Sequence, residues 1–140
     1  MDESIQNLIT IIDTHLETKP LKDLDISDYK IKNYISHINL KIDDYSKNTI
    51  FRNNKFEIVI ISWYKNSIAP LHFHPKNGCI LKVLNGNLSE RKLLNDETIK
   101  ITQLKENDVS YIDNSIGTHE IIALDFSISL HIYSPPGFYD

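Results

Sequence analysis

The chain has 140 residues, of which 41% are hydrophobic and 24% are charged, and this length and composition are typical of one folded domain. Glycine (4) and proline (5) are too sparse for collagen-like repeats or long disordered linkers. The formal net charge of −4 gives no indication of a surface for nucleic acid or for an anionic membrane, so we expect neither as a partner.

Targeting signals and disulfides are not expected. The first residues, Met1-Asp2-Glu3-Ser4, are acidic rather than basic, which is unlike a signal peptide. No apolar run approaches the roughly 20 residues that a membrane-spanning helix needs. The single cysteine, Cys79, has no partner for an internal disulfide, which favours a reducing compartment. We therefore expect a cytoplasmic protein.

Two N-terminal stretches show helical spacing. In residues 4–12 the apolar positions 5, 8, 9, 11 and 12 form one stripe, with Asp2 or Ser4 available as the N-cap and Pro20 as the end. A second helix is expected near residues 28–39, where large apolar side chains recur every three or four residues. Residues 1–43 are thus predicted to hold two short helices.

From Tyr45 onward the period of the pattern changes to two. Residues 56–63 are almost continuously apolar, as expected of a strand buried on both faces. Residues 79–84 lead into Asn85-Gly86, a strong hairpin signal, with 88–94 as the returning strand. Further strands are expected at 98–104, 109–112, 119–124 and 127–134. The class is therefore mainly β: one domain over residues 1–140, with a small β-barrel or jelly roll at 44–140.

The pair His72-x-His74 is the most informative polar motif. Pro75 disfavours a helical conformation at His74, so the pair is expected to be extended, with both imidazoles on one face. Two imidazoles on one face can bind one metal ion. Taken alone, however, the pair favours the alternative of solvated histidines at the edge of a polar strand.

His119 is a candidate third ligand, because it follows a glycine turn and begins an apolar strand. Alone it would more often be a hydrogen-bonded structural histidine. Together the three histidines predict a metal site, and imidazole suits Fe, Zn, Cu and Ni alike.

The last predicted strand alternates strictly between polar and apolar residues. Ser129, His131 and Tyr133 share one face, and the aliphatic residues at 128, 130 and 132 share the other. In one alternative the polar face meets water. In the other, the polar face lines a cavity and the aliphatic face packs on the N-terminal helices. The pattern alone leaves both alternatives open.

Three ordered motifs resemble one known family. They are His72-x-His74 with Cys79 five residues later, the segment 109–119 ending in His119, and Ser129-Leu130-His131-Ile132-Tyr133-Ser134-Pro135-Pro136. From Tyr45 to Pro136 the chain resembles the thiol dioxygenases of the cysteine dioxygenase type, which are cupins. The resemblance implies a cupin-type β-barrel.

The resemblance also implies an activity and its residues. Fe(II) would be bound by His72, His74 and His119, and both atoms of O₂ would be added to the sulfur of cysteine to give the sulfinic acid. Tyr133 would be the active-site tyrosine, oriented by a hydrogen-bonded relay of Ser129 and His131. Cys79 would be joined to Tyr133 by a thioether, and the alternative for Cys79 is an ordinary buried side chain.

The chain departs from the family where the substrate carboxylate is expected. The family motif Tyr-x-Arg-Asn is Tyr45-Ser46-Lys47-Asn48 here, and a lysine lacks the planar fork of arginine. Arg52 is a candidate substitute, with a solvated loop arginine as the alternative.

The leading hypothesis is an Fe(II) thiol dioxygenase that uses O₂ and a small thiol. The alternatives are a cupin that uses another metal and a non-catalytic cupin that binds a thiol or a metal. The oligomeric state is left open.

Overall fold

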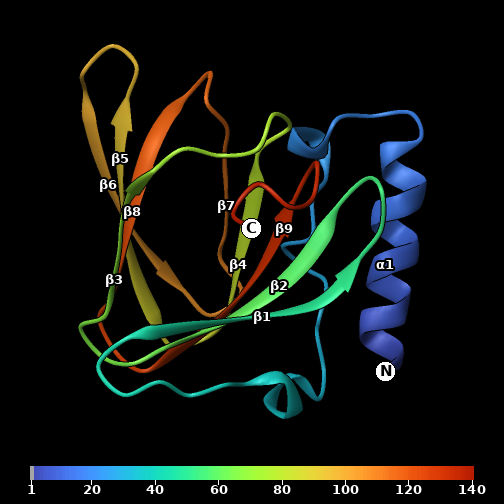
Figure 1. The fold of residues 1–140 in the computed structure, drawn as a ribbon, viewed down its shortest axis with the longest axis horizontal. Helices are drawn as coiled ribbons and strands as arrows, with labels where there is room; N and C mark the ends of the chain where they lie inside the picture. The colour runs from blue at the N-terminus through green and yellow to red at the C-terminus, as the bar shows by residue number, and fades with distance from the viewer. Residues whose placement is uncertain (1) are drawn as a thin grey trace.

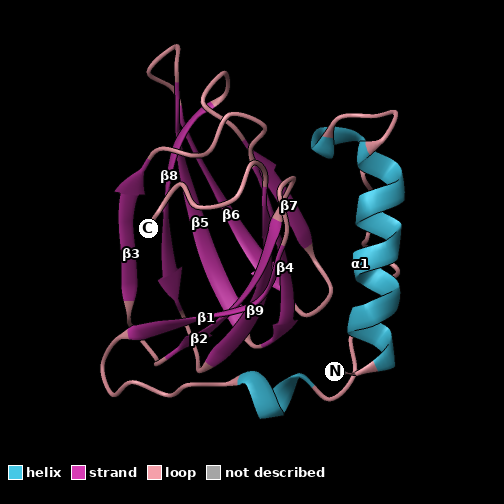
Figure 2. Ribbon diagram, turned by 45° about the vertical axis from the view of Figure 1, so that its right-hand side comes forward, coloured by secondary structure: helices cyan, strands magenta, loops and turns pink. Residues whose placement is uncertain are grey.

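The computed structural model describes residues 2–140 as one helix, two 3₁₀ turns and nine strands in two facing sheets (Figures 1 and 2). The elements are α1 (Glu3–Leu16), turns at Leu21–Asp23 and Tyr34–His37, β1 (Tyr45–Arg52), β2 (Glu57–Trp63), β3 (Ile68–His72), β4 (Cys79–Asn85), β5 (Asn87–Leu94), β6 (Ile99–Lys105), β7 (Val109–Ile112), β8 (Gly117–Ala123) and β9 (Ser127–Tyr133). One sheet has the order β1-β2-β9-β4-β7, the other β3-β8-β5-β6, and every pairing is antiparallel. The mainly β prediction is confirmed, although the two sheets do not close into one barrel.

Helix α1 covers the outer face of the five-stranded sheet (Figure 2). Asp2 is its N-cap and accepts a hydrogen bond from the amide of Ser4 at 2.8 Å. The buried stripe of α1 joins Ile128, Leu130 and Ile132 in one core cluster, so of the two alternatives for β9 the structure has the one in which the aliphatic face packs on the helix. Within residues 2–140, no helix combines the length and the apolar character needed to cross a bilayer.

The predicted second helix at 28–39 is wrong. The structure has only the short turn Tyr34–His37 there, because Asn33 takes a left-handed conformation at φ 56° that interrupts a helix. The segment is instead tied to the start of α1. The Lys32 amide donates to Ser4 Oγ at 2.9 Å, and Asn33 Nδ2 donates to the Asp2 carboxylate at 2.7 Å. The apolar spacing therefore reflects side chains that pack on the sheet from a mostly irregular segment.

The predicted hairpin at Asn85-Gly86 is also wrong, although both flanking strands form. The strand before it, β4, pairs with β7 and β9, whereas the strand after it, β5, pairs with β6 and β8. Gly86 has φ 95°, and a Cβ there would meet Ser127 Oγ and the Phe126 carbonyl. The dipeptide therefore turns the chain from one sheet to the other.

Lys82 fastens the N-terminal segment to the sheet. Its side chain is 1% exposed, and Nζ donates to the carbonyl oxygens of Ile26, Ser27 and Asn107 at 3.0, 2.9 and 3.4 Å. We expect Lys82→Met to lower the free energy of unfolding by about 2–4 kcal/mol, because the three carbonyl oxygens lose their hydrogen-bond donor where little water can replace it. Urea unfolding measures the change, and exposed Lys100→Met is the control. Equal stability of both variants would contradict this role.

Candidate metal centre and cavity

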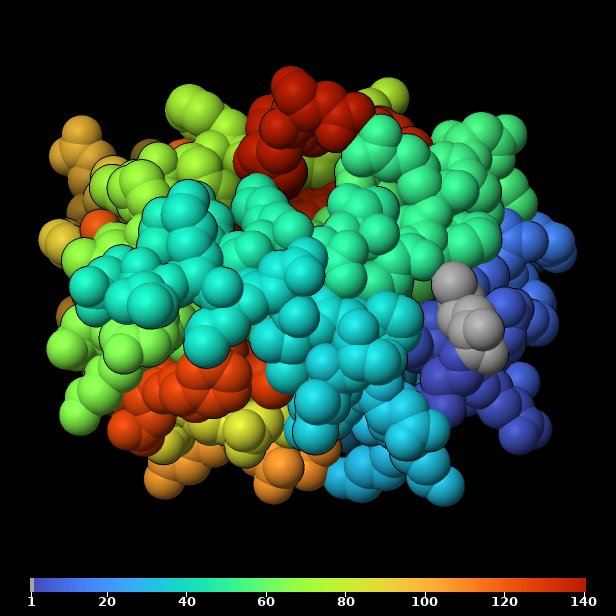
Figure 3. Space-filling model, turned by 60° about the horizontal axis from the view of Figure 1, so that its bottom comes forward, coloured from blue at the N-terminus to red at the C-terminus, as the bar shows by residue number. Residues whose placement is uncertain are grey.

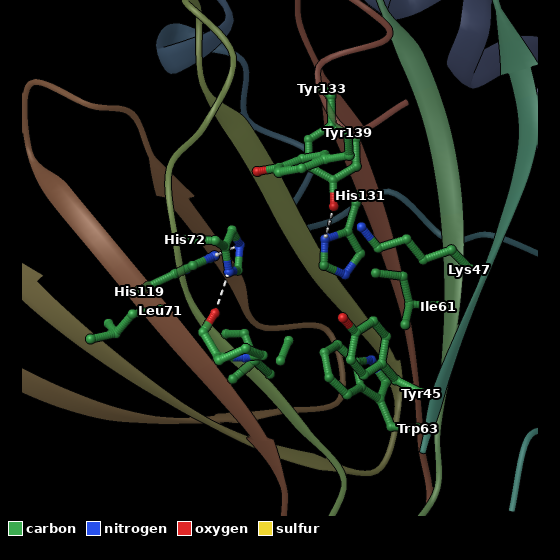
Figure 4. Close-up of a pocket in the computed structure, with 13 residues that line it drawn as sticks. Tyr45, Lys47, Ile61, Trp63, Leu71, His72, His119, His131, Tyr133 and Tyr139 are labelled. Atoms are coloured by element: carbon green, nitrogen blue, oxygen red, sulfur yellow. Dashed lines mark hydrogen bonds between the residues drawn. The ribbon is translucent and has the colours of Figure 1, made fainter.

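Three histidine side chains converge between the sheets. His72 ends β3, His74 lies two residues further on, and His119 stands opposite His72 in the β3–β8 pairing. One ring nitrogen from each lies within 4.8 Å of the other two, and the ring centroids are 4.5 to 4.9 Å apart. Figure 4 shows two of these rings, His72 and His119, with the contact between them. The structure thus brings together the three histidines that the sequence suggested as ligands.

Hydrogen bonds orient two of these rings. His72 Nδ1 lies 2.7 Å from the Pro70 carbonyl and His119 Nδ1 lies 2.8 Å from a Glu90 oxygen, so each Nδ1 carries the proton and donates. The two Nε2 atoms, left as acceptors, face each other at 3.0 Å. Two nitrogen lone pairs at this distance can both coordinate a single metal cation.

His74 completes the cluster. Both of its ring nitrogens are buried, and neither has a hydrogen-bond partner among residues 2–140. Asn114 fixes its backbone: Oδ1 accepts from the His74 amide and Nδ2 donates to the His74 carbonyl, both at 2.9 Å. A buried imidazole without a partner normally costs free energy, and a metal ion would satisfy it. The donor set therefore fits a divalent transition-metal ion.

Glu90 is the buried acid behind the cluster. It is 2% exposed and also accepts a hydrogen bond from Ser110 at 2.6 Å, while Lys92 Nζ lies 3.8 Å away. Burial raises the pKa of its carboxyl, but the bonds from His119 and Ser110 and the charge of Lys92 outweigh this, so the pKa is below its usual value. Glu90 is therefore an anion in direct contact with one of the three clustered histidines.

Burial lowers the pKa of His72 to about 4 and that of His74 to about 3. Both values lie below the usual 6.5, so acid protonates these histidines in the unfolded chain first. We therefore expect these two histidines to leave the free energy of unfolding of the metal-free protein unchanged above pH 6.5. As the pH falls from 6.5 toward 4, the unfolded chain binds protons that the folded protein does not, so the free energy of unfolding decreases. Thermal unfolding across this range tests the expectation. Comparison with His74→Leu isolates the contribution of His74, and parallel pH profiles for the two proteins would contradict it.

The opposite wall of the cavity carries the polar residues of β9. Ser129 Oγ lies 2.7 Å from His131 Nε2, and His131 Nδ1 lies 3.2 Å from the Tyr133 hydroxyl. All three side chains are buried. The polar face of β9 therefore points inward rather than to water, with Ser129, His131 and Tyr133 in one hydrogen-bonded chain.

Cys79 lies beside this chain. It is 2% exposed and stands directly opposite Tyr133 in the β4–β9 pairing. Its Sγ is 3.9 Å from His131 Nδ1, and burial raises the pKa of the thiol well above its usual range. Because paired residues project to the same face of a sheet, the Cys79 and Tyr133 side chains are neighbours.

The cavity between the two walls measures about 150 Å³. Besides His72, His119, His131 and Tyr133, its lining includes Tyr45, Lys47, Trp63 and Tyr139. In Figure 4 the imidazoles of His72 and His119 lie across this space from His131 and Lys47. The cavity therefore connects the histidine cluster, the hydrogen-bonded chain of β9 and one cation.

Tyr139 forms part of the cavity wall. Its hydroxyl donates to the Phe73 carbonyl at 2.7 Å, between the two histidines of the His-x-His motif. Its ring packs 5.2 Å from that of Tyr133, and Lys47 Nζ lies 4.4 Å from its centroid. Removal of the Lys47 ammonium from water lowers its pKa, although the nearby Cys79 and Glu57 oppose this effect. Phe73 itself is 66% exposed and points away from the cluster.

Arg52 lies outside this cavity. Its guanidinium forms a fork with Asp140, at 2.8 and 2.9 Å, and a third bond with Glu57 at 2.9 Å. This ion pair holds the red segment that follows β9 against the teal end of β1, side by side on the face shown in Figure 3. Arg52 therefore has its guanidinium engaged by two carboxylates at the end of β1, and it does not line the cavity beside the histidines.

Sequence reasoning missed four residues of this site. Trp63 is buried in the core and also lines the cavity. Glu90 offered a signal, because it occupies an inward position two residues after buried Leu88 on the same strand. Asn114 and Tyr139 carried none, since their partners, His74 and the Phe73 carbonyl, are distant in sequence.

The chain is similar to known proteins over most of its length. The family model described as cysteine dioxygenase type I matches residues 26–139. Cysteine dioxygenase type 1 of Homo sapiens is 34% identical over 103 residues, which cover 66% of this chain and 52% of the human protein. The protein of the same name from Rattus norvegicus is 35% identical with the same coverage. The chain thus spans about half the length of the curated relatives it matches.

Solved structures share the fold at low identity. An RmlC-like cupin from Desulfovibrio desulfuricans has a TM-score of 0.62 and 18% identity, covering 77% of this chain and 98% of that one. A conserved protein with a double-stranded β-helix domain from Klebsiella pneumoniae has a TM-score of 0.63 and 15% identity, covering 75% and 89%. The fold is therefore cupin-like.

Proposed function

The chain belongs to the cysteine dioxygenase type I family, and on that premise we propose that it adds both atoms of O₂ to the sulfur of a small free thiol. L-cysteine is the first candidate, and the product is its sulfinic acid. The observation that carries the proposal is the convergence of three histidine nitrogens on a cavity whose other wall holds Tyr133 and Lys47. A metal-binding centre, a hydroxyl and a cation thus share one space.

We assign Fe(II) to His72, His74 and His119. Three neutral imidazoles suit this ion and leave coordination positions free, while the choice of iron over zinc, copper or nickel rests on the family. Bound there, Fe(II) would supply the redox chemistry of O₂ and the acidity of a coordinated thiol.

Tyr133 acts as the hydrogen-bond donor. Burial raises the pKa of its hydroxyl well above the usual value, so the proton stays in place at neutral pH. A hydroxyl held in the cavity wall can donate to the negative charge that develops on oxygen during the reaction. Ser129 and His131 hold Tyr133 in position through the bonds described above.

Lys47 is the proposed partner of the substrate carboxylate, with Tyr45 beside it in the lining. Its ammonium reaches the cavity, whereas the Arg52 guanidinium is engaged by Asp140 and Glu57. A lysine offers a point charge without the directional fork of an arginine, so it holds a carboxylate with less geometric control.

Lys47→Arg is therefore expected to shift the preference among thiols. We expect kcat/KM to rise about tenfold for L-cysteine and 3-mercaptopropionate, the equivalent of about 1.4 kcal/mol for one improved ionic hydrogen bond. Cysteamine lacks a carboxylate, so its kcat/KM stays constant. Steady-state kinetics with the three thiols measure the ratios, and Lys65→Arg, on the surface, is the control. Unchanged ratios would reject Lys47 as the carboxylate partner.

We also propose a thioether between Cys79 Sγ and the Tyr133 ring, supported by their pairing across β4 and β9. One carbon–sulfur bond forms as the thiol hydrogen and one ring hydrogen leave, and O₂ accepts the two electrons. Intact mass spectrometry after aerobic turnover would then show a protein two hydrogens lighter than the sequence, and Cys79→Ser would show no such deficit. An unchanged wild-type mass would refute the bond.

One experiment tests the proposed function directly. Metal analysis of the purified protein is combined with O₂ uptake and product mass spectrometry during aerobic incubation with L-cysteine. We expect iron, and one cysteine sulfinic acid formed per O₂ consumed. Tight binding of the thiol without O₂ consumption would contradict the proposal and favour a non-catalytic cupin.

Because the only thiol is free and buried, we propose that the protein works in the cytoplasm.

A further inference from the structure

Trp63 donates a hydrogen bond into the chain of polar residues on β9. It ends β2, is 1% exposed, and its indole Nε1 lies 2.8 Å from Ser129 Oγ. An indole N–H can only donate, so Ser129 Oγ must accept this bond. The direction of the first link is therefore fixed by chemistry.

The second link follows from the buried hydroxyl of Ser129. Ser129 is 0% exposed, and within residues 2–140 its Oγ has only Trp63 Nε1 and His131 Nε2 within hydrogen-bond distance. If Nε2 carried the His131 proton, Oγ would accept twice and its own proton would have no acceptor. A buried donor without an acceptor is unfavourable, so the hydroxyl donates to Nε2.

The third link places the histidine proton. Burial lowers the pKa of His131 well below its usual value, so the ring is neutral and carries one proton. Because Nε2 accepts, this proton is on Nδ1, which lies 3.2 Å from the Tyr133 hydroxyl and 3.9 Å from Cys79 Sγ, a weaker acceptor. The Tyr133 oxygen accepts this bond, and its own proton remains free to point into the cavity.

We propose that Trp63 is a positioning residue, which sets the tautomer of His131 and thereby keeps the Tyr133 proton available to a ligand in the cavity. The inference rests on the proposed function, since this hydroxyl is the one assigned to the reacting oxygen. In the opposite tautomer Tyr133 would donate to Nδ1 and present only lone pairs to developing negative charge. Trp63 acts through Ser129 and His131, at a distance from the reacting atoms.

The tautomer of His131 can be measured without turnover. We choose nitrogen-15 NMR of the full chain loaded with Zn(II), a diamagnetic ion that imidazole also binds. The wild type is expected to show a protonated Nδ1 and an unprotonated Nε2. Trp63→Phe keeps an aromatic ring beside Tyr45 but has no N–H, so Ser129 can turn its proton away. We expect the tautomer ratio to shift about tenfold toward protonated Nε2, about 1.4 kcal/mol for one hydrogen bond.

Two further variants keep the test decisive. Ile61 lies opposite Ser129 in the β2–β9 pairing, and Ile61→Val reduces the side-chain packing next to Ser129. The change removes none of the hydrogen bonds that link Trp63, Ser129 and His131, so it should leave the tautomer unchanged. Ser129→Ala removes the donor to Nε2 directly, so it should shift the ratio even if Trp63→Phe does not fold. A protonated Nε2 in the wild type, or the wild-type ratio in Trp63→Phe or in Ser129→Ala, would overturn the inference. A protein that oxidises no thiol would refute the proposed function and leave this measurement intact.

Discussion

Tyr133→Phe is expected to lower kcat about 10²–10³-fold while the iron content stays at the wild-type value. The magnitude is that of losing one positioned donor to developing negative charge in a site shielded from water. The phenylalanine ring still packs against Tyr139, and Tyr133 has no hydrogen bond to any of the three clustered histidines. Binding of the metal and of the thiol should therefore change little. Steady-state kinetics and metal analysis of the same preparation measure both quantities.

Tyr34→Phe is the matched control. It also removes one phenol hydroxyl, but Tyr34 is a half-buried side chain against the core outside the five-stranded sheet, and within residues 2–140 its hydroxyl donates one long bond, of 3.5 Å, to the Leu84 carbonyl. We expect kcat close to the wild-type value in this variant. If Tyr133→Phe loses iron in proportion to its activity, Tyr133 has a structural role and the assignment as donor is wrong.

Short local patterns identified the three histidines as ligand candidates, whereas their convergence joins positions 47 residues apart and was expected from the family resemblance. His72 and His74 are two residues apart before a proline, and His119 begins a strand after a glycine turn. The alternation along β9 likewise placed Ser129 and His131 on one face. Whether that face is exposed to solvent or buried could not be predicted from β9 alone, because its burial depends on the second sheet and on α1. Iron binding by the cluster stays a prediction.

Where the sequence misled, long-range contacts decided the structure. Residues 28–39 have helical spacing, but Lys32 and Asn33 bond to Ser4 and Asp2 in place of a helical backbone ladder. Asn85-Gly86 has a hairpin composition, yet β9 already pairs with β4 on one side while β7 pairs on the other. A local turn preference of this kind yields when each strand is better buried in a different sheet.

Glu90 shows why the surroundings of the clustered histidines are harder to predict than the histidines themselves. Its partners His119 and Ser110 are 29 and 20 residues away in sequence, and no spacing links them. Its carboxylate lies 2.8 Å from His119 Nδ1 and so places a negative charge beside the cluster. A buried carboxylate behind an imidazole both fixes the ring and strengthens the ring nitrogen as a ligand.

We therefore expect Glu90→Gln to weaken metal binding about 10–100-fold. The glutamine side chain has nearly the same shape, and its oxygen can still accept from His119 Nδ1, so the change removes the negative charge rather than the hydrogen bond. The dissociation constant for Fe(II), measured anaerobically by competition with a chelator, reports the effect without reference to turnover. The same measurement with Zn(II) shows whether the effect depends on charge alone.

Glu57→Gln separates this effect from a general loss of buried charge. Glu57 is 5% exposed, comparable to Glu90, but its carboxylate bonds to Arg52 and to the Gly137 amide rather than to a clustered histidine. The glutamine oxygen can still accept from Arg52, but Asp140 is then the one anion bonded to the guanidinium, so the variant is destabilised while its metal affinity stays constant. Equal loss of affinity in both variants would mean that the cluster responds to stability or to overall charge. A loss confined to Glu90→Gln would assign the effect to the anion that contacts His119.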